Sequence, residues 1–218
     1  MKEKKEFIPA LGYNWLTGFY DFVIRLTMPE KKFRAKLIDE LKPKNDESIL
    51  EFGFGTGQNL ILAHQRNNKT QFIGVDIDPK VKAIAEHKMN KLGFDITLDL
   101  YDGNTFPYTA NSFDKVFSSL VFHQLDKEIK LSCLKEIYRV LKPNGQLIIG
   151  DWGKAKSKIM RIAFCIVQIL DGFKTTNDNV KGLLPKFIEQ AGFKNVNEID
   201  FINTKIGTYS YYKAIKLN

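Results

Sequence analysis

Three glycines spaced two residues apart separate a short apolar run from a helical pattern. The stretch reads ILEFGFGTGQNL over residues 49–60, with Gly53, Gly55 and Gly57 following the acid Glu51. Glycine adopts positive φ angles readily and lets a ligand lie against bare backbone. In an open parallel sheet, ligands bind at the carboxyl ends of the strands, where such strand–loop–helix corners lie. The stretch therefore predicts an α/β fold with a small-molecule site at this corner.

The remaining residues alternate between strand and helix patterns, which is typical of a parallel sheet with helices on both faces. Strands are expected at 48–52, 70–76, 96–101, 113–118 and 146–150, and helices at 58–66, 78–92 and 127–141. After a further helix at 183–191, two strands at 196–201 and 208–215 follow without a helix between them, which predicts an antiparallel hairpin. We therefore expect a Rossmann-like, doubly wound, mostly parallel seven-stranded sheet with a C-terminal antiparallel hairpin and an N-terminal helical cap.

A length of 218 residues predicts a single domain. We expect its parts to be a helical cap at 1–45 (helices at 13–27 and 31–41), a ligand-binding core at 46–152, a lid-like insertion at 153–182, and a helix with the C-terminal hairpin at 183–218.

The spacing of the glycines separates two ligand classes. A dinucleotide site needs the pattern G-x-G-x-x-G, and its third glycine would fall on Gln58. The carboxylate of Glu51 would also repel a pyrophosphate, whereas it suits a ligand that carries an ammonium or sulfonium charge. An NAD-dependent dehydrogenase is therefore the alternative and a cationic ligand the main expectation.

The glycine stretch, together with three later motifs, resembles the class I S-adenosylmethionine-dependent methyltransferases. The later motifs are IGVDIDP at 73–79, YDGNTFPYTANSFDKVFSS at 101–119 and EIYRVLKPNGQLIIGDW at 136–152. The resemblance extends over roughly residues 13–215 and is strongest to the ubiquinone/menaquinone-biosynthesis type, which shares an early Tyr-Asp pair, here Tyr20 and Asp21. It implies S-adenosylmethionine as the cofactor and S-adenosylhomocysteine as the product.

Chemistry and the resemblance agree on a set of cofactor-binding residues. The glycines give the methionine and ribose parts room, Glu51 holds the amino end, and Asp76 accepts the ribose hydroxyls. Ile77 packs on the adenine, Asp102 accepts its exocyclic amine, and Gly103 offers a backbone N–H to the ring. Ser118 and Ser119 border the methyl group at the end of the fourth strand. The expected set is Glu51, Gly53, Gly55, Gly57, Asp76, Ile77, Asp102, Gly103, Ser118, Ser119 and Tyr20.

Methyl transfer needs alignment of the two reactants, and needs a general base only if the acceptor must lose a proton. His123, in SSLVFHQL, follows the fourth strand and is the candidate base. A histidine packed or hydrogen-bonded within the loop is the alternative. The histidines and acids show no metal-ligand spacing, so no metal is expected.

The sequence lacks the motifs of the familiar nucleobase methyltransferases. Methyltransferases that act on base amino groups resemble one another in an [N/D]-P-P-[Y/F] motif, where this chain has SSLVF at 118–122. Those that act on cytosine C5 resemble one another in a Pro-Cys nucleophile, and here neither Cys133 nor Cys165 follows a proline. Aromatic and apolar residues are instead dense in two segments expected to border the acceptor: Tyr13, Trp15, Phe19, Tyr20 and Phe22 in one, and Trp152, Ile159, Phe164, Ile166, Ile169 and Phe173 in the other. The main expectation is a small apolar acceptor such as a quinone precursor, a lipid or another metabolite. An RNA or protein methyltransferase and a non-catalytic binding protein remain alternatives.

The net charge is +8, with Lys and Arg in small groups that include Lys154, Lys156, Lys158 and Arg161. Such groups suit a solvated surface, an anionic membrane surface or nucleic acid, and no appended nucleic-acid-binding module is evident. The first residues lack an apolar signal segment, the two cysteines form no disulfide framework, and the apolar run 159–170 is too short to span a membrane. We expect a cytoplasmic protein with peripheral contact to the inner membrane surface. Its oligomeric state is not predicted.

Overall fold

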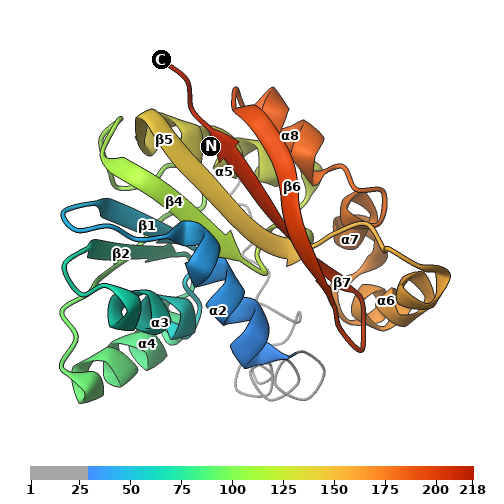
Figure 1. The fold of residues 1–218 in the computed structure, drawn as a ribbon, viewed down its shortest axis with the longest axis horizontal. Helices are drawn as coiled ribbons and strands as arrows, with labels where there is room; N and C mark the ends of the chain where they lie inside the picture. Colours follow the sequence, from blue (N-terminus) through green and yellow to red (C-terminus); the bar gives the residue numbers. More distant parts are fainter. Residues whose placement is uncertain (1–28) are drawn as a thin grey trace, which may run out of the picture.

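The computed structural model describes residues 29–218, apart from the side chains of Leu170 and Asp171. Seven strands of this part of the chain form one sheet in the order β3-β2-β1-β4-β5-β7-β6 (Figure 1). The strands are β1 Ser48–Phe52, β2 Gln71–Asp76, β3 Thr97–Leu100, β4 Phe113–Ser119, β5 Leu141–Trp152, β6 Lys194–Asn203 and β7 Thr208–Ile215. The first five are parallel, and β7 is antiparallel to both β5 and β6. The predicted fold class is confirmed.

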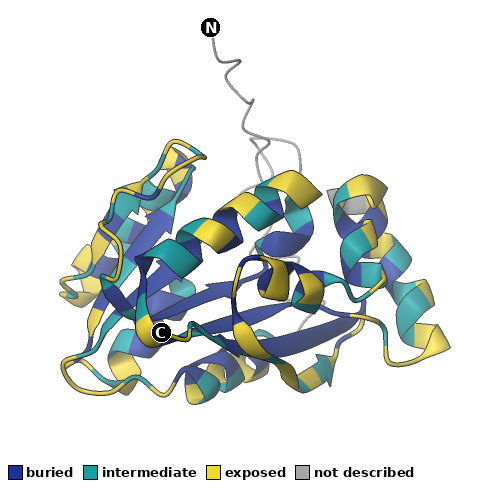
Figure 2. Cartoon of the chain, turned by 90° about the horizontal axis from the view of Figure 1, so that it is seen from above, coloured by how far each residue is buried: buried dark blue, intermediate teal, exposed yellow. Residues whose placement is uncertain are grey.

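Helices cover both faces of the sheet (Figure 1). They are α2 Glu30–Leu41, α3 Gln58–Arg66, α4 Pro79–Leu92, α5 Lys127–Val140, α6 Lys158–Asp171, α7 Phe173–Val180 and α8 Leu184–Gln190, with a 3-10 turn, η2, at Phe122–Gln124. Helices α2, α3 and α4 share one apolar cluster with the sheet, and α5 and α8 share the other. The buried residues thus form two layers, one on each side of the strands, as the colouring in Figure 2 shows.

Local sequence explains where the helices begin and end. Asp78 caps α4 by accepting a hydrogen bond from the Lys80 backbone N–H, and Pro79 occupies the first helical position. Gly93 ends the same helix with a φ of 68°. Ser157 caps α6 through Oγ, which accepts from the Met160 N–H.

The order of the strands reverses beside β1. Strand β1 pairs with β2 on one side and with β4 on the other, and Phe52 lies opposite Ser118. The carboxyl ends of β1, β2 and β4 therefore meet at one edge of the sheet, the place where open α/β sheets bind ligands.

Three expectations are refined by the structure. Of the N-terminal cap, the described helix α2 lies on a face of the sheet beside α3, and the expected helix 13–27 falls outside the described residues. Strand β5 begins at Leu141, not at 146, because Leu141 already pairs with Phe113. The segment 153–182 contains the helices α6 and α7. A search of the described residues found no helix with the length and apolar character needed to cross a membrane.

Candidate functional site

The loop after β1 holds the three glycines in left-handed conformations, but the glycines have different surroundings. A Cβ on Gly53 would lie 2.4 Å from Cγ2 of Val121, and one on Gly57 would lie 3.0 Å from Cβ of Ala85. Those two glycines allow close packing against neighbouring segments. A Cβ on Gly55, with φ of 52°, would meet no atom of the described residues within 4 Å. Gly55 is therefore the glycine of this loop that faces open space, where a ligand has room.

Asp76, at the end of β2, fixes this loop through its carboxylate. Its Oδ2 accepts a hydrogen bond of 2.8 Å from the Gly55 backbone N–H, and its Oδ1 accepts from Ile77 and Asp78 N–H groups. Burial raises the pKa of Asp76, and the three backbone bonds oppose that rise. A carboxylate has about four acceptor sites, so about one remains. Accepting both ribose hydroxyls, as the sequence led us to expect, requires one backbone bond to be exchanged.

Ile77 and Gly103 approach each other beyond the ends of β2 and β3. A Cβ on Gly103, whose φ is 83°, would lie 3.2 Å from Cδ1 of Ile77. The exposed Asp102 accepts hydrogen bonds from the Asn104 and Thr105 backbone N–H groups through Oδ1, and these bonds lower its pKa. The structure therefore brings the predicted adenine-contacting residues to one place. Asp102 is ionised there, and one of its two carboxylate oxygens, Oδ1, already accepts hydrogen bonds from the turn that follows it.

Glu51 is fully buried beneath the glycine loop. Its Oε1 accepts a hydrogen bond of 2.8 Å from Nδ2 of Asn59, while Oε2 has no hydrogen-bond partner in the described part of the chain. Burial raises the pKa of Glu51 to about 8, with Asn59 and Arg34 acting in the opposite direction. A buried carboxyl oxygen without a partner is costly, and a cationic ligand would relieve that cost.

Two residues that the sequence did not predict connect Glu51 to α2. Arg34 donates from Nη1 to Oδ1 of Asn59 at 2.7 Å, and from Nε to Oε1 of Glu30 at 2.9 Å. The result is a chain of polar contacts from Glu30 through Arg34 and Asn59 to Glu51. This chain orients the Asn59 amide, so its Nδ2 faces Glu51.

The hydroxyls of the two serines that end β4 each form a hydrogen bond with another residue of the protein. Ser118 Oγ donates to the Phe52 carbonyl at 2.8 Å, across the β1–β4 junction. Ser119 Oγ lies 2.9 Å from the hydroxyl of Tyr209, a fully buried residue of β7. Gly150 makes this contact possible, because a Cβ there would lie 2.0 Å from the Tyr209 oxygen. Both serines lie at the end of β4, and both hydroxyls are hydrogen-bonded within the protein. Their predicted place beside the methyl group stays a prediction.

His123 lies in η2, beyond the end of β4, and is buried against the end of β5. Its Nδ1 is 2.7 Å from Oδ1 of Asp151, and its backbone N–H donates to Oδ2 of the same carboxylate at 3.2 Å. Asp151 is fully buried and also accepts from the Trp152 N–H. Asp151 is not among the residues predicted from the sequence, although an acid directly after the predicted strand 146–150, in IIGDW, could have suggested it.

An aromatic wall continues from this pair. The Trp152 ring centroid lies 6.5 Å from that of His123 and 5.5 Å from that of Phe164 in α6. Helix α6, however, separates the residues expected to line one acceptor pocket. Phe164 is buried with Trp152, whereas Ile159, Ile166, Ile169 and Phe173 are exposed. The expectation of one shared lining is corrected, because the helical period places these side chains on opposite faces.

Tyr20 and the other N-terminal aromatic residues lie outside the described residues. Among the described residues, no group of three or more His, Cys, Asp or Glu side chains could hold a metal ion.

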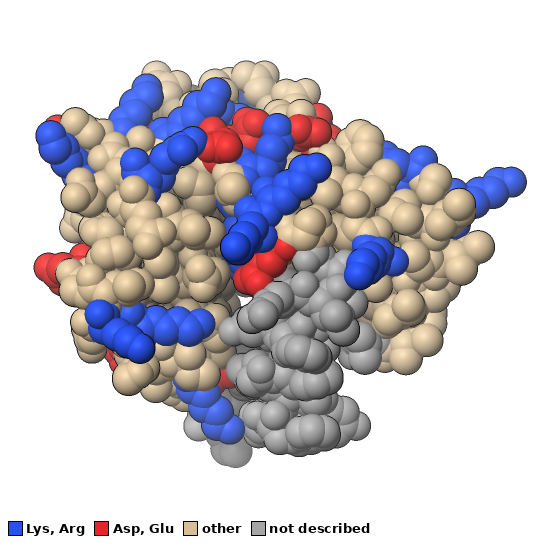
Figure 3. Space-filling model, turned by 60° about the horizontal axis from the view of Figure 1, so that its bottom comes forward, with Lys and Arg blue, Asp and Glu red and all other residues tan. Residues whose placement is uncertain are grey.

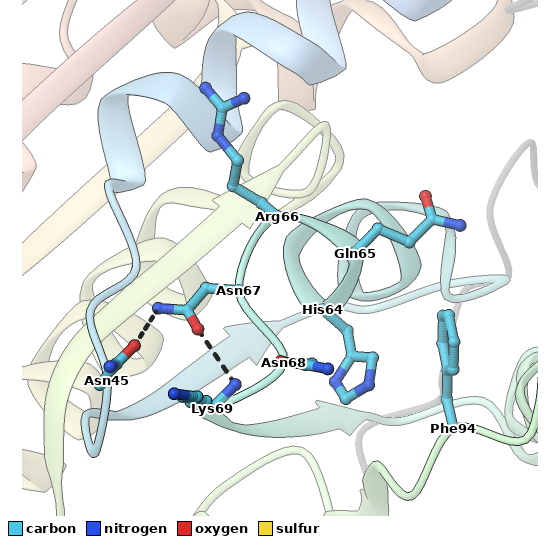
Figure 4. A pocket seen from close by; sticks show the side chains of 8 residues that line it. All are labelled: Asn45, His64, Gln65, Arg66, Asn67, Asn68, Lys69 and Phe94. Atoms are coloured by element: carbon cyan, nitrogen blue, oxygen red, sulfur yellow. Dashed lines mark hydrogen bonds between the residues drawn. The ribbon is translucent and has the colours of Figure 1, made fainter.

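A separate hollow of about 450 Å³ lies at the far end of α3 (Figure 4). Its lining residues are Asn45, His64, Gln65, Arg66, Asn67, Asn68, Lys69 and Phe94. In it, Asn67 donates to Oδ1 of Asn45 and accepts from the Lys69 N–H. Because α3 starts at the glycine loop and has nine residues, its far end is about 13 Å away along the helix. This hollow is therefore not part of the site at the carboxyl ends of the strands.

Comparisons with known proteins point to one family and one fold. A methyltransferase domain family matches residues 49–145. The chain is 33% identical over 207 residues to a demethylmenaquinone methyltransferase of Bacteroides fragilis, covering 86% of this chain and 82% of that protein.

Solved structures of low sequence identity have the same fold. An S-adenosylmethionine-dependent methyltransferase of Aquifex aeolicus superposes with a TM-score of 0.67 at 22% identity, covering 90% of this chain and 98% of that one. A phosphoethanolamine N-methyltransferase of Haemonchus contortus, in complex with S-adenosylmethionine, gives 0.67 at 18% identity, covering 85% of this chain and 52% of that one.

Proposed function

The chain belongs to the S-adenosylmethionine-dependent methyltransferase family, and from that premise we propose that its acceptor is a small quinol-type ring with an apolar side chain. The observation that carries the proposal is the buried His123–Asp151 pair, which lies next to an aromatic wall at the ends of β4 and β5. A demethylmenaquinone methyltransferase from Bacteroides fragilis, 33% identical to this chain, supports the choice of ring.

The residues at the ends of β1, β2 and β3 fit the cofactor. S-adenosylmethionine, when bound, supplies a methyl group made electrophilic by a positively charged sulfur. Gly55 leaves room beside the backbone, and Glu51 has a buried oxygen, without a partner among residues 29–218, that can face a cationic amino group. Ile77 and Gly103 offer apolar and backbone surface for a flat ring. We propose that these residues hold the cofactor, together with Asp76 and Asp102.

His123 is the proposed base. A carboxylate accepts hydrogen bonds only, so Asp151 selects the tautomer with the proton on Nδ1 and leaves the lone pair on Nε2. Nε2 would take the proton of an acceptor hydroxyl, which makes the ring carbons beside that hydroxyl electron-rich enough to accept a methyl group. The methylated carbon would then lose its own hydrogen as a proton to solvent, which restores the aromatic ring, and His123 would return its proton to the ring oxygen. Asp151 stabilises the imidazolium that this transfer creates, so we propose it as a positioning residue.

The surroundings of the pair favour an apolar acceptor. Trp152, Phe164 and Tyr209 are nearly or fully buried at this end of the sheet, and the ring centroid of Trp152 lies 6.4 Å from that of Tyr209. Burial raises the pKa of Tyr209 well above its ordinary value, so its hydroxyl stays neutral. An aromatic ring would exchange water for aromatic neighbours here, which is favourable.

The test is a methylation assay with defined acceptors. The full-length protein is incubated with labelled S-adenosylmethionine and either a short-chain naphthoquinol without a ring methyl group, phosphoethanolamine or total RNA. We expect label in the organic phase, with product mass raised by one methylene, only for the quinol. Label in RNA or phosphoethanolamine alone would contradict the proposed acceptor. Retention of full turnover by His123→Gln would contradict the proposed base.

A further inference from the structure

Helix α6 presents a row of isoleucines to solvent. Ile159, Ile162 and Ile169 are 73%, 71% and 72% exposed, and Ile166 is half exposed. At about 100° per residue these four positions fall within roughly a quarter of the helix circumference. Phe173, the first residue of α7, is also exposed. We call these five residues the α6 stripe. Contiguous exposed apolar side chains of this size mark an interaction surface.

The opposite side of α6 belongs to the core beside the candidate acceptor site. Phe164, Val167 and Gln168 are buried, and Phe164 packs edge-on against Trp152. Trp152 follows Asp151, the residue that holds His123. One helix therefore separates the α6 stripe from the proposed base, so whatever covers the stripe also lies next to the acceptor side of the molecule.

Basic residues lie close in sequence to both ends of the stripe. The segment 153–182 contains six Lys or Arg residues and two Asp residues. Lys156 forms an ion pair with Glu198, and Lys174 with Asp126. Among the described residues, the ion pairs include neither Lys154, which lies in the segment before α6, nor Lys158, the first residue of α6, and both are exposed. On the right of Figure 3, where α6 and α7 lie, the surface is mainly uncharged with Lys and Arg at its margin.

We propose that the α6 stripe docks on the surface of an anionic lipid bilayer. An apolar helix face with basic residues along its border is the signature of a helix that lies in the membrane interface. Lysine side chains near such a surface are attracted to its anionic headgroups, so the charges of the protein and of the bilayer are complementary. Only the benefit of docking, delivery of a membrane-held acceptor to the His123 side, rests on the proposed function.

Vesicle co-sedimentation of the full chain tests the docking without any turnover. The vesicles are phosphatidylcholine alone or phosphatidylcholine with about one third phosphatidylglycerol. We expect binding to the anionic vesicles that weakens as salt is raised. The Ile162→Gln/Ile169→Gln variant should bind at least tenfold more weakly, and Lys154→Gln/Lys158→Gln should lose most of the salt dependence. The matched control, Ile84→Gln/Leu92→Gln, removes two exposed apolar side chains from α4 and should bind like the native protein.

Three outcomes would overturn the proposal. One is equal binding by the isoleucine variant and the native protein. Another is a native dimer, measured by light scattering, that the isoleucine variant dissociates while neither protein binds vesicles, since a second copy would then cover the stripe. The third is binding to RNA but not to vesicles. Circular dichroism and calorimetric titration with S-adenosylmethionine show that each variant is folded. Vesicle binding without methylation of the quinol would leave the docking intact and reject the proposed acceptor.

Discussion

Asp151 holds His123 by two hydrogen bonds, one to the ring nitrogen Nδ1 at 2.7 Å and one to the backbone N–H at 3.2 Å. The two residues lie at the ends of neighbouring strands, where Ser119 of β4 pairs with Gly150 of β5. A carboxylate that binds both the ring and the backbone of one histidine fixes the position and the tautomer of that ring together. This arrangement suits proton transfer and is more than packing requires.

Asp151→Asn should lower turnover by about 10- to 100-fold, because the amide no longer selects the tautomer or stabilises the imidazolium. The affinity for S-adenosylmethionine should stay the same, since Asp151 does not belong to the proposed cofactor-binding set. Steady-state kinetics and calorimetric titration measure the two effects. The pH dependence of kcat should also change, which a purely structural defect would not produce.

Asp114→Asn is the control for this change. Asp114 is also an aspartate of the sheet, but it pairs with Lys142 at the surface. Its substitution should leave turnover near the native level. If both variants lose turnover in proportion to their loss of thermal stability, Asp151 has no positioning role.

Glu51→Gln should make the free protein less sensitive to alkaline pH. The pKa of Glu51 is raised in the folded state to about 8, from an ordinary value of 4.5. Its contribution to stability is therefore complete below pH 4.5 and is lost as the pH rises towards 8. The free energy of unfolding of the native protein should fall over that window by an amount on the order of a few kcal/mol relative to the variant. Chemical denaturation of both proteins between pH 5 and 9 measures this difference.

The ionisation of Glu51 should also make the affinity for S-adenosylmethionine depend on pH. If Glu51 faces the cationic amino group, binding favours the carboxylate, so the native affinity for S-adenosylmethionine should rise between pH 6 and 8. Glu51→Gln should remove that rise and weaken binding at pH 8. A native pH profile indistinguishable from that of the variant would place the amino group elsewhere.

The element order and the position of the glycine corner could be predicted from the sequence because both depend on local patterns. Strand β7 and the glycine loop lie at the residues predicted, and the hairpin pairs as expected. Both partners of the His123–Asp151 pair are in the sequence, but their contact depends on the register between β4 and β5. Local patterns do not carry that register.

How the helices pack against one another and the sheet could not be predicted from the sequence either. The contact between Arg34 and Asn59 exists because α2 lies beside α3 on the sheet, and no local pattern specifies that placement. In α6, apolar residues occur on both faces, so the sequence does not show which of Phe164 and Ile166 is buried and which is exposed. The structure separates them, one into the core and one into solvent.

Asp76→Ala should weaken S-adenosylmethionine binding by about 30-fold, corresponding to about 2 kcal/mol for the loss of a charged hydrogen-bond acceptor. The structure adds a second reason, since Asp76 also holds the Gly55 N–H at 2.8 Å. His123→Ala should leave this affinity unchanged, because His123 belongs to the acceptor side. Calorimetric titration of both variants compares them directly. Equal affinities would contradict the separation of the two roles.

Gly55→Val should abolish cofactor binding while the protein remains folded, and Gly93→Val provides a matched control. Both glycines have positive φ angles, 52° and 68°, and in the described part of the chain no atom lies within 4 Å of the position that a Cβ would take on either. Each substitution should therefore cost about 1–2 kcal/mol of stability through backbone strain alone. The difference lies in location: Gly55 borders the open space above Asp76, whereas Gly93 ends α4. The midpoint of thermal unfolding should shift similarly for both variants. Calorimetry should detect S-adenosylmethionine binding to the native protein and to Gly93→Val, but not to Gly55→Val. Normal binding by Gly55→Val would mean that the cofactor does not lie against this loop.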